Sequence, residues 1–235
     1  MGNHQSNLSS RKASEVWSGR AAALVILCLL ICGLSFFCDD AVIEWVKAND
    51  SKPLKEFAGF LSRWGDWPEL MLYGVIGLGI SSMTRTRQLF KLVVCMMVAA
   101  TIAGAVVNSV RLVSGRARPN NREAVKEWNG LWNGKEFLLF KSKYHSFPSG
   151  HTGAAFAFFG VPLFANKRDW WPLLVAAGIG WSRVYLNVHH LSDVVVGTAV
   201  GLITAAFVWR HLGKGKSKKA KGKNEEGRTP LTSAE

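Results

Sequence analysis

Charged residues are scarce in this chain, and acidic residues are scarcer than basic ones. Asp, Glu, Lys and Arg make up 19% of the 235 residues, with 16 acidic against 29 basic side chains. The four cysteines form neither a disulfide framework nor a zinc motif, because they lie within or at the end of apolar stretches. The sequence also shows no cluster of carboxylates of the kind that binds Mg²⁺. These absences argue against a disulfide-stabilised secreted domain and against a zinc or magnesium enzyme.

The apolar residues are gathered into long runs between the charges. Six runs occur, at residues 21–38, 70–84, 92–110, 152–166, 170–182 and 194–209. A membrane-spanning helix needs about 17 to 25 mainly apolar residues. The first and third runs meet this requirement, and the others meet it with a polar residue or two at each end. Because almost no amphipathic helix remains to form a soluble surface, we predict an all-α integral membrane bundle of six transmembrane helices.

The first run also has to be compared with a signal peptide. It is too long for the apolar core of one, and Cys38-Asp39-Asp40 is a poor cleavage site. We therefore expect it to be retained as the first transmembrane helix.

Basic residues indicate the orientation of this bundle. They gather in the N-terminal segment, in the loops after the second and fourth runs, and in the Lys-rich tail. These segments all fall on one side, which the positive-inside rule makes cytoplasmic. We predict a cytoplasmic segment (1–20), a transmembrane domain (21–210) and a disordered cytoplasmic tail (211–235). Residues 39–69, 111–151 and the turn around His189 then lie on the outer face of a cell (inner) membrane, periplasmic or exterior.

Three short strings supply groups that suit phosphate chemistry, and all three fall in these outer segments. They are Arg111-x6-Arg118-Pro119, Pro148-Ser149-Gly150-His151 and Ser182-Arg183-x5-His189-x3-Asp193. Any one of them alone is a weak signal. Together, in this order and separated by apolar runs, they predict a site that holds a phosphate and cleaves it through a histidine.

The arginines are the predicted phosphate-binding groups. Arg111 and Arg118 are seven residues apart, so they share a helix face if the third run continues as a helix to Pro119. One arginine at the end of a span is often an interfacial anchor. Three of them on the outer side, counting Arg183, instead favour a clamp for phosphate oxygens.

The second string opens an apolar helix. Ser149 is a good N-cap, Gly150 lets a ligand approach the backbone closely, and the helix N-terminus attracts an anion. His151 then lies directly before the start of a predicted transmembrane helix.

The third string pairs a histidine with a carboxylate. His189 and Asp193 are four residues apart and share a face if helical. The carboxylate can accept the Nδ1–H of the imidazole, which leaves Nε2 free as a nucleophile. We expect the adjacent His190 to point elsewhere.

These strings resemble the three-part signature of the type 2 phosphatidic acid phosphatase superfamily, which includes membrane lipid phosphate phosphatases and soluble vanadium haloperoxidases. The resemblance runs from Arg111 to Asp193 and departs at one position, where the family has Lys and this chain has Arg111. Six spans with the motifs on one face match the membrane branch.

The resemblance implies a mechanism without a metal or another cofactor. His189 would attack phosphorus and form a phosphohistidine, Asp193 would orient it, and His151 would protonate the leaving oxygen. The phosphoryl oxygens would be held by Arg111, Arg118, Arg183, Ser149 and Gly150.

The implied substrate is a phosphate monoester or diphosphate of a membrane lipid, with no nucleic-acid partner. Phosphatidate, phosphatidylglycerophosphate, undecaprenyl diphosphate and lipid A 1-phosphate all remain open. The alternatives are a vanadium-dependent haloperoxidase-like enzyme, against which the six spans argue, and a non-catalytic lipid-binding protein, against which the intact histidines and Asp193 argue. The oligomeric state stays open.

Overall fold

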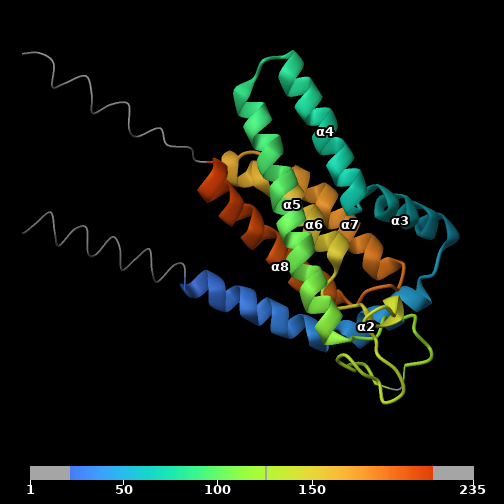
Figure 1. The fold of residues 1–235 in the computed structure, drawn as a ribbon. Helices are drawn as coiled ribbons and strands as arrows, with labels where there is room; N and C mark the ends of the chain where they lie inside the picture. The colour runs from blue at the N-terminus through green and yellow to red at the C-terminus, as the bar shows by residue number, and fades with distance from the viewer. Residues whose placement is uncertain (1–21, 125, 214–235) are drawn as a thin grey trace, which may run out of the picture.

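The computed structural model describes residues 22–124 and 126–213, and this part of the chain is helical (Figure 1). No strand is present in it, only two isolated bridges in the long loop. The prediction of an all-α fold is therefore confirmed. The first helix is Ala22–Phe37, and it is followed by α2 Asp39–Ala48, α3 Lys52–Trp64, α4 Trp67–Met83, α5 Arg87–Ser114, η1 Ser142–Tyr144, α6 Gly150–Ala165, α7 Pro172–Tyr185, α8 Leu191–Val208 and η2 Trp209–Gly213.

The centre of the bundle is α6, which packs against α5, α7 and α8 (Figure 1). Small residues make these contacts close. A Cβ atom added at Gly201 of α8 would lie 2.6 Å from the carbonyl oxygen of Gly153 in α6. Buried alanines fill much of the rest of the contact between α5, α6 and α8. Such small-residue interfaces are how helices associate in a membrane, where apolar side chains gain little by leaving lipid.

Two helices are long and apolar enough to cross a membrane by themselves. They are α5, with 28 residues, and α8 continued through η2, with 23. The helix Ala22–Phe37 and α2 form a possible third span that is bent by 53°. The other predicted runs coincide with α4, α6 and α7, which have 17, 16 and 14 residues. The number of six spans therefore stays a prediction.

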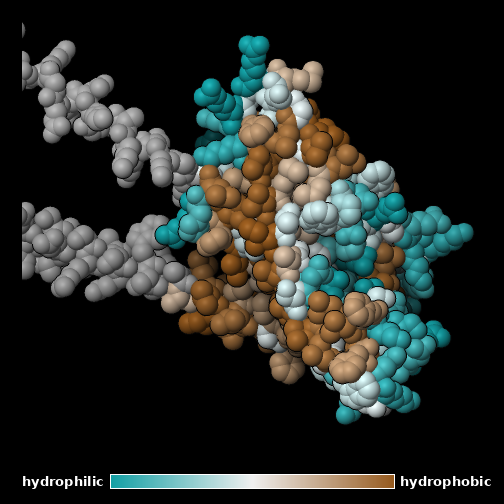
Figure 2. Space-filling view, viewed as in Figure 1, coloured by the Kyte–Doolittle hydropathy of each residue, from teal (hydrophilic) through white to brown (hydrophobic). Residues whose placement is uncertain are grey.

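The surface has the character expected of a membrane protein. Figure 2 shows hydrophobic side chains along the length of α4 and α5, with hydrophilic residues near the turn between these helices and around the opposite end. Many large apolar side chains, such as Ile76, Ile80 and Val106, are exposed. A continuous exposed apolar surface of this kind is stable where lipid covers it.

One helix end differs from the expectation. Gly115 has a φ of +57° and ends α5 after Ser114. A Cβ atom there would lie 1.8 Å from the carbonyl oxygen of Gly130, so only glycine fits. Arg111 therefore lies in the last helical turn, whereas Arg118 lies in the following loop, and the two do not share a helix face.

Candidate active site

The three sequence strings meet at one end of the bundle although they belong to different elements. Arg111 is in the last turn of α5, Ser149 is the N-cap residue of α6, and Arg183 is in the last turn of α7. His189 lies in the turn after α7, and Asp193 is in the first turn of α8. The amide of Ser149 donates a hydrogen bond to the carbonyl oxygen of Asp193 at 3.0 Å, which joins the second string to the third.

His189 and Asp193 form a buried pair. The imidazole Nδ1 lies 3.4 Å from Oδ2 of Asp193, and the two side chains are 2% and 0% exposed. The pair does not depend on a shared helix face, because α8 begins only at Leu191. Burial lowers the pKa of His189 to about 4, although Asp193 opposes this shift. The imidazole is therefore neutral at pH 7, which is the form that a nucleophile requires.

His190 also contacts this carboxylate, so the expectation that it points elsewhere is wrong. It is the N-cap residue of α8, and its backbone amide donates to Oδ2 of Asp193 at 2.9 Å. Its Nδ1 lies 3.3 Å from the same oxygen. The reason is the helix start itself, because an acidic residue at the third helical position folds back onto the N-cap amide.

The three predicted phosphate-binding arginines share an unusual feature. The Nε atoms of Arg111, Arg118 and Arg183 are buried and have no hydrogen-bond partner within the described part of the chain. Arg183 is oriented by Ser62 of α3, whose hydroxyl accepts from Nη1. Arg118 is half-buried, and this burial lowers the pKa of its guanidinium. Buried Nε–H groups of cations that have no partner indicate an anion site.

Gly150 and Ser149 lie against this group. A Cβ atom added to Gly150 would lie 1.9 Å from Nη2 of Arg111, so the missing side chain makes room for the guanidinium. The hydroxyl of Ser149 is fully buried and accepts a hydrogen bond from Thr152 at 2.9 Å. Its own proton and the free amides at the start of α6 are then available to bind an anion.

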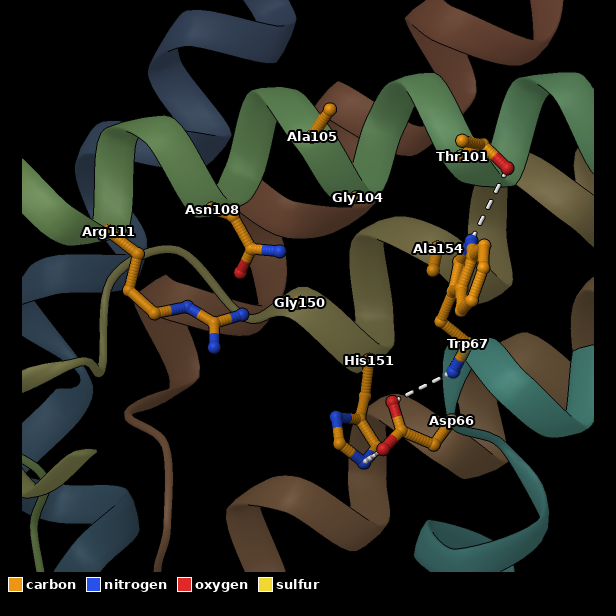
Figure 3. A pocket seen from close by; sticks show the side chains of 10 residues that line it. All are labelled: Asp66, Trp67, Thr101, Gly104, Ala105, Asn108, Arg111, Gly150, His151 and Ala154. Carbon is orange, nitrogen blue, oxygen red and sulfur yellow. Dashed lines mark hydrogen bonds and ion pairs between the residues drawn. The ribbon is translucent and has the colours of Figure 1, made fainter. Parts of the chain in front are cut away.

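His151 faces a neighbouring cavity of about 290 Å³ (Figure 3). Its Nε2 lies 3.5 Å from Oδ2 of Asp66. Asp66 also caps α4, because its Oδ1 accepts the amide of Trp67 at 2.8 Å. Sequence reasoning missed Asp66 as a site residue, although an aspartate directly before Trp67-Pro68 is a helix-start signal. The remaining wall comes mostly from α5, through Thr101, Gly104, Ala105, Asn108 and Arg111.

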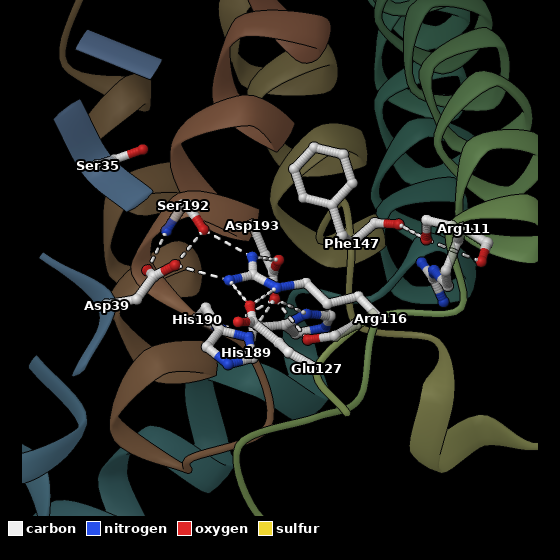
Figure 4. A network of polar contacts seen from close by, with 12 residues as sticks. Ser35, Asp39, Arg111, Arg116, Glu127, Phe147, His189, His190, Ser192 and Asp193 are labelled. Carbon is white, nitrogen blue, oxygen red and sulfur yellow. Dashed lines mark hydrogen bonds and ion pairs between the residues drawn. The ribbon is translucent and has the colours of Figure 1, made fainter. Parts of the chain in front are cut away.

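A second residue missed from the sequence is Arg116, which lies in the loop between two motif arginines. Its side chain is 1% exposed, and Nη1 donates to Oδ1 of Asp193 at 2.5 Å (Figure 4). In the sequence, only the position of Arg116 between Arg111 and Arg118 could have indicated that it belongs to the site.

Among the residues that the structure describes, no group of three or more His, Cys, Asp or Glu side chains is placed to hold a metal ion.

Comparisons with known proteins found a matching family and several relatives. The model of the PAP2 superfamily matches residues 90–216, more than half of the chain. Lipid phosphate phosphatase 1 of Arabidopsis thaliana is 30% identical over 49% of this chain and 42% of its own length. The probable diacylglycerol pyrophosphate phosphatase 1 of Schizosaccharomyces pombe is 30% identical over 62% of this chain and 61% of its own length. The chain thus spans about half the length of these curated relatives.

A solved structure shows the same fold. It is the transmembrane PAP2 type phosphatidylglycerolphosphate phosphatase of Bacillus subtilis, with a TM-score of 0.58 and 21% identity. The likeness covers 84% of this chain and 98% of that one. Together with the apolar helices α5 and α8, it indicates an integral membrane protein.

Proposed function

The chain belongs to the PAP2 superfamily, and on that basis we propose that it is a membrane phosphatase that hydrolyses a lipid phosphate monoester or diphosphate. The observation that carries this proposal is the trio of buried, unpartnered arginine Nε atoms beside His189 and His151. A phosphate supplies several anionic oxygen acceptors, so one phosphoryl group can accept from all three guanidinium groups at once. Arg111, where the family resemblance has Lys, fits this role because its guanidinium lies against Gly150.

The proposed reaction has two covalent steps. Nε2 of neutral His189 attacks phosphorus while the bond to the leaving oxygen breaks, and His151 gives that oxygen a proton. Asp193 accepts the Nδ1–H of His189 and stabilises the cationic ring that forms. Water then attacks the phosphohistidine with His151 as the base, which returns both histidines to their starting forms and releases phosphate. The arginines, Ser149 and the Gly150 amide hold the phosphoryl oxygens throughout.

A lipid substrate is supported by the position of the site. The cavity beside His151 is lined by residues of α5, which is one of the helices long enough to cross a membrane. A phosphate at the arginines would therefore leave the rest of the substrate beside an apolar helix. Phosphatidate, phosphatidylglycerophosphate, undecaprenyl diphosphate and lipid A 1-phosphate are the candidates that we propose to test.

We also propose that the site faces the outer side of the membrane and that both termini are cytoplasmic. The support is the charge distribution, since Arg85 in the turn between α4 and α5 and Arg87 at the start of α5 lie at the end opposite to the site (Figure 1). Segment 1–20 and nearly all of the tail 211–235 lie outside the described residues.

Phosphate release by the purified full chain in detergent tests the activity. The four candidate lipids are offered separately in the presence of EDTA, with His189→Gln as the matched inactive control. We expect release from at least one lipid by the wild type and none by the variant. Folded wild-type protein that releases phosphate from none of the four would overturn the proposal.

A further inference from the structure

Arg116 makes four side-chain hydrogen bonds at the site, although it is not one of the defining residues of the three strings. Its Nη1 donates to Asp193 and to Ser192 Oγ at 2.6 Å, and its Nη2 donates to Asp39 Oδ2 at 2.7 Å. Nε donates to Glu127 at 2.7 Å. Figure 4 shows the guanidinium between Asp39 and Ser192 on one side and the carboxylate of Asp193 on the other.

Arg116 and the histidines use different oxygens of Asp193. Arg116 holds Oδ1, whereas Ser146, His190 and His189 all approach Oδ2. A carboxylate fixed through one oxygen cannot rotate freely, so the other oxygen keeps its direction toward Nδ1 of His189. Through its contact with Asp193, Arg116 therefore also helps to fix the orientation of His189.

Arg116 is itself held from the opposite side. Asp39, in the first turn of α2, accepts from Arg116 and also accepts the backbone amide of Ser192 at 2.9 Å. The rings of Phe36, Trp128 and Phe147 surround the guanidinium carbon, at 5.3, 4.8 and 6.0 Å from their centroids. The cation is thus fixed by acidic and aromatic groups, as buried guanidinium groups require.

A simple structural role would be to tie the long loop to α2. Contacts with Asp39 and Glu127 alone would satisfy that role. The contact with Asp193 is not needed for that structural role. It places a permanent positive charge beside the carboxylate that His189 contacts.

We propose that Arg116 is a positioning residue for phosphoryl transfer, which orients Asp193 toward His189 and limits how strongly that carboxylate favours the protonated imidazole, whereas the negative charge of Asp39 partly offsets this limit. The catalytic part of this inference rests on the proposed function. The electrostatic part does not, because it concerns His189 in the protein without substrate.

The charges that act on His189 come from several elements. Asp193 favours the protonated ring, whereas Arg183 of α7 and Arg118 of the loop oppose it, and His151 of α6 also lies within range. Arg116 reaches His189 through Asp193, whose negative charge it partly neutralises. Removing the Arg116 charge therefore raises the pKa of His189, and removing the Asp39 charge as well lowers it part of the way back.

The test compares Arg116→Gln, Arg116→Lys and the double variant Arg116→Gln/Asp39→Asn with wild type. Arg87→Gln serves as the control, because Arg87 is exposed at the other end of α5. The full chain is labelled with nitrogen-15 and the imidazole of His189 is titrated in detergent, with assignment from His189→Gln. We expect the midpoint to rise by about one pH unit in Arg116→Gln, to stay near wild type in Arg116→Lys, and to lie between the two in the double variant.

Kinetics on dioctanoyl phosphatidate, or on whichever lipid is hydrolysed, supply the second readout. We expect kcat of Arg116→Gln to fall by about tenfold or more while KM stays within about twofold, because the phosphate-holding arginines are intact. Folded Arg116→Gln with an unchanged His189 midpoint would overturn the inference, as would an equal loss in Arg116→Lys. If Arg116→Gln does not fold, the double variant takes its place. A His189 midpoint above that of wild type then supports the inference, and an unchanged midpoint contradicts it.

The two proposals fail in distinguishable ways. Wild-type protein that hydrolyses no lipid phosphate contradicts the proposed function and leaves the titration to decide the role of Arg116. Active wild-type protein with an unmoved titration contradicts only the inference on Arg116.

Discussion

Substitution of Gly150 by alanine tests how closely the arginines are placed around the phosphate. The added Cβ would lie 1.9 Å from Nη2 of Arg111, against an ordinary contact of about 3.4 Å, so the guanidinium has to move by about 1.5 Å. A displacement of about 1 Å at a reacting centre can lower the rate by about 100-fold. We therefore expect kcat/KM of Gly150→Ala to fall by about 100-fold, which corresponds to about 2.7 kcal/mol of transition-state stabilisation.

The assay is phosphate release by the purified full chain over a range of lipid concentrations. Gly79→Ala in α4 is the matched control, because nothing lies within 4 Å of its added Cβ. A double-mutant cycle with Arg111→Lys adds a sharper test. Lysine has no Nη2, so in that background Gly150→Ala should cost much less than in wild type. A folded Gly150→Ala protein with kcat/KM within about twofold of wild type would contradict the prediction, and so would an undiminished loss in the Arg111→Lys background.

Three further predictions follow from other contacts. His151→Gln should lower kcat by about 100-fold or more for an alkyl phosphate and much less for p-nitrophenyl phosphate, whose leaving oxygen needs no proton; equal losses for both substrates would contradict the acid role. Because the pKa of His189 is lowered to about 4, kcat/KM should be lost only as the pH falls below about 5, after correction for the substrate phosphate; a midpoint near 6.5 would contradict this. Gly201→Ala should lower the free energy of unfolding by about 1–3 kcal/mol in thermal or denaturant unfolding, because its Cβ would lie 2.6 Å from the Gly153 oxygen, whereas Gly79→Ala should not.

The sequence was sufficient for the features that depend on local pattern. Apolar runs predicted the helices because burial in lipid requires helical backbone with apolar side chains. The spacing within Ser182-Arg183-x5-His189-x3-Asp193 was enough to pair His189 with Asp193, even though α8 begins only at Leu191. Fixed spacing within a short segment limits the possible distances whatever the exact helix boundary is.

Features that depend on distant contacts could not be predicted in this way. Arg183 is oriented by Ser62, which is 121 residues earlier, and Arg116 joins Asp39 to Asp193 across separations of 77 residues on either side. The end of α5 at Ser114 is set by the backbone of Gly130, which fits only against a glycine. No local pattern carries this information, because it arises only when the loop folds over the ends of the helices.

The proposed reaction requires that His189 receives the phosphoryl group, and this can be tested by trapping the intermediate. Wild-type protein is mixed with a substrate labelled in its phosphate, quenched in alkali within the first turnovers and digested for mass spectrometry. We expect phosphate on the imidazole of His189 in wild type and no labelled protein in His189→Gln. Label on any other residue, or labelling that persists in His189→Gln, would contradict it.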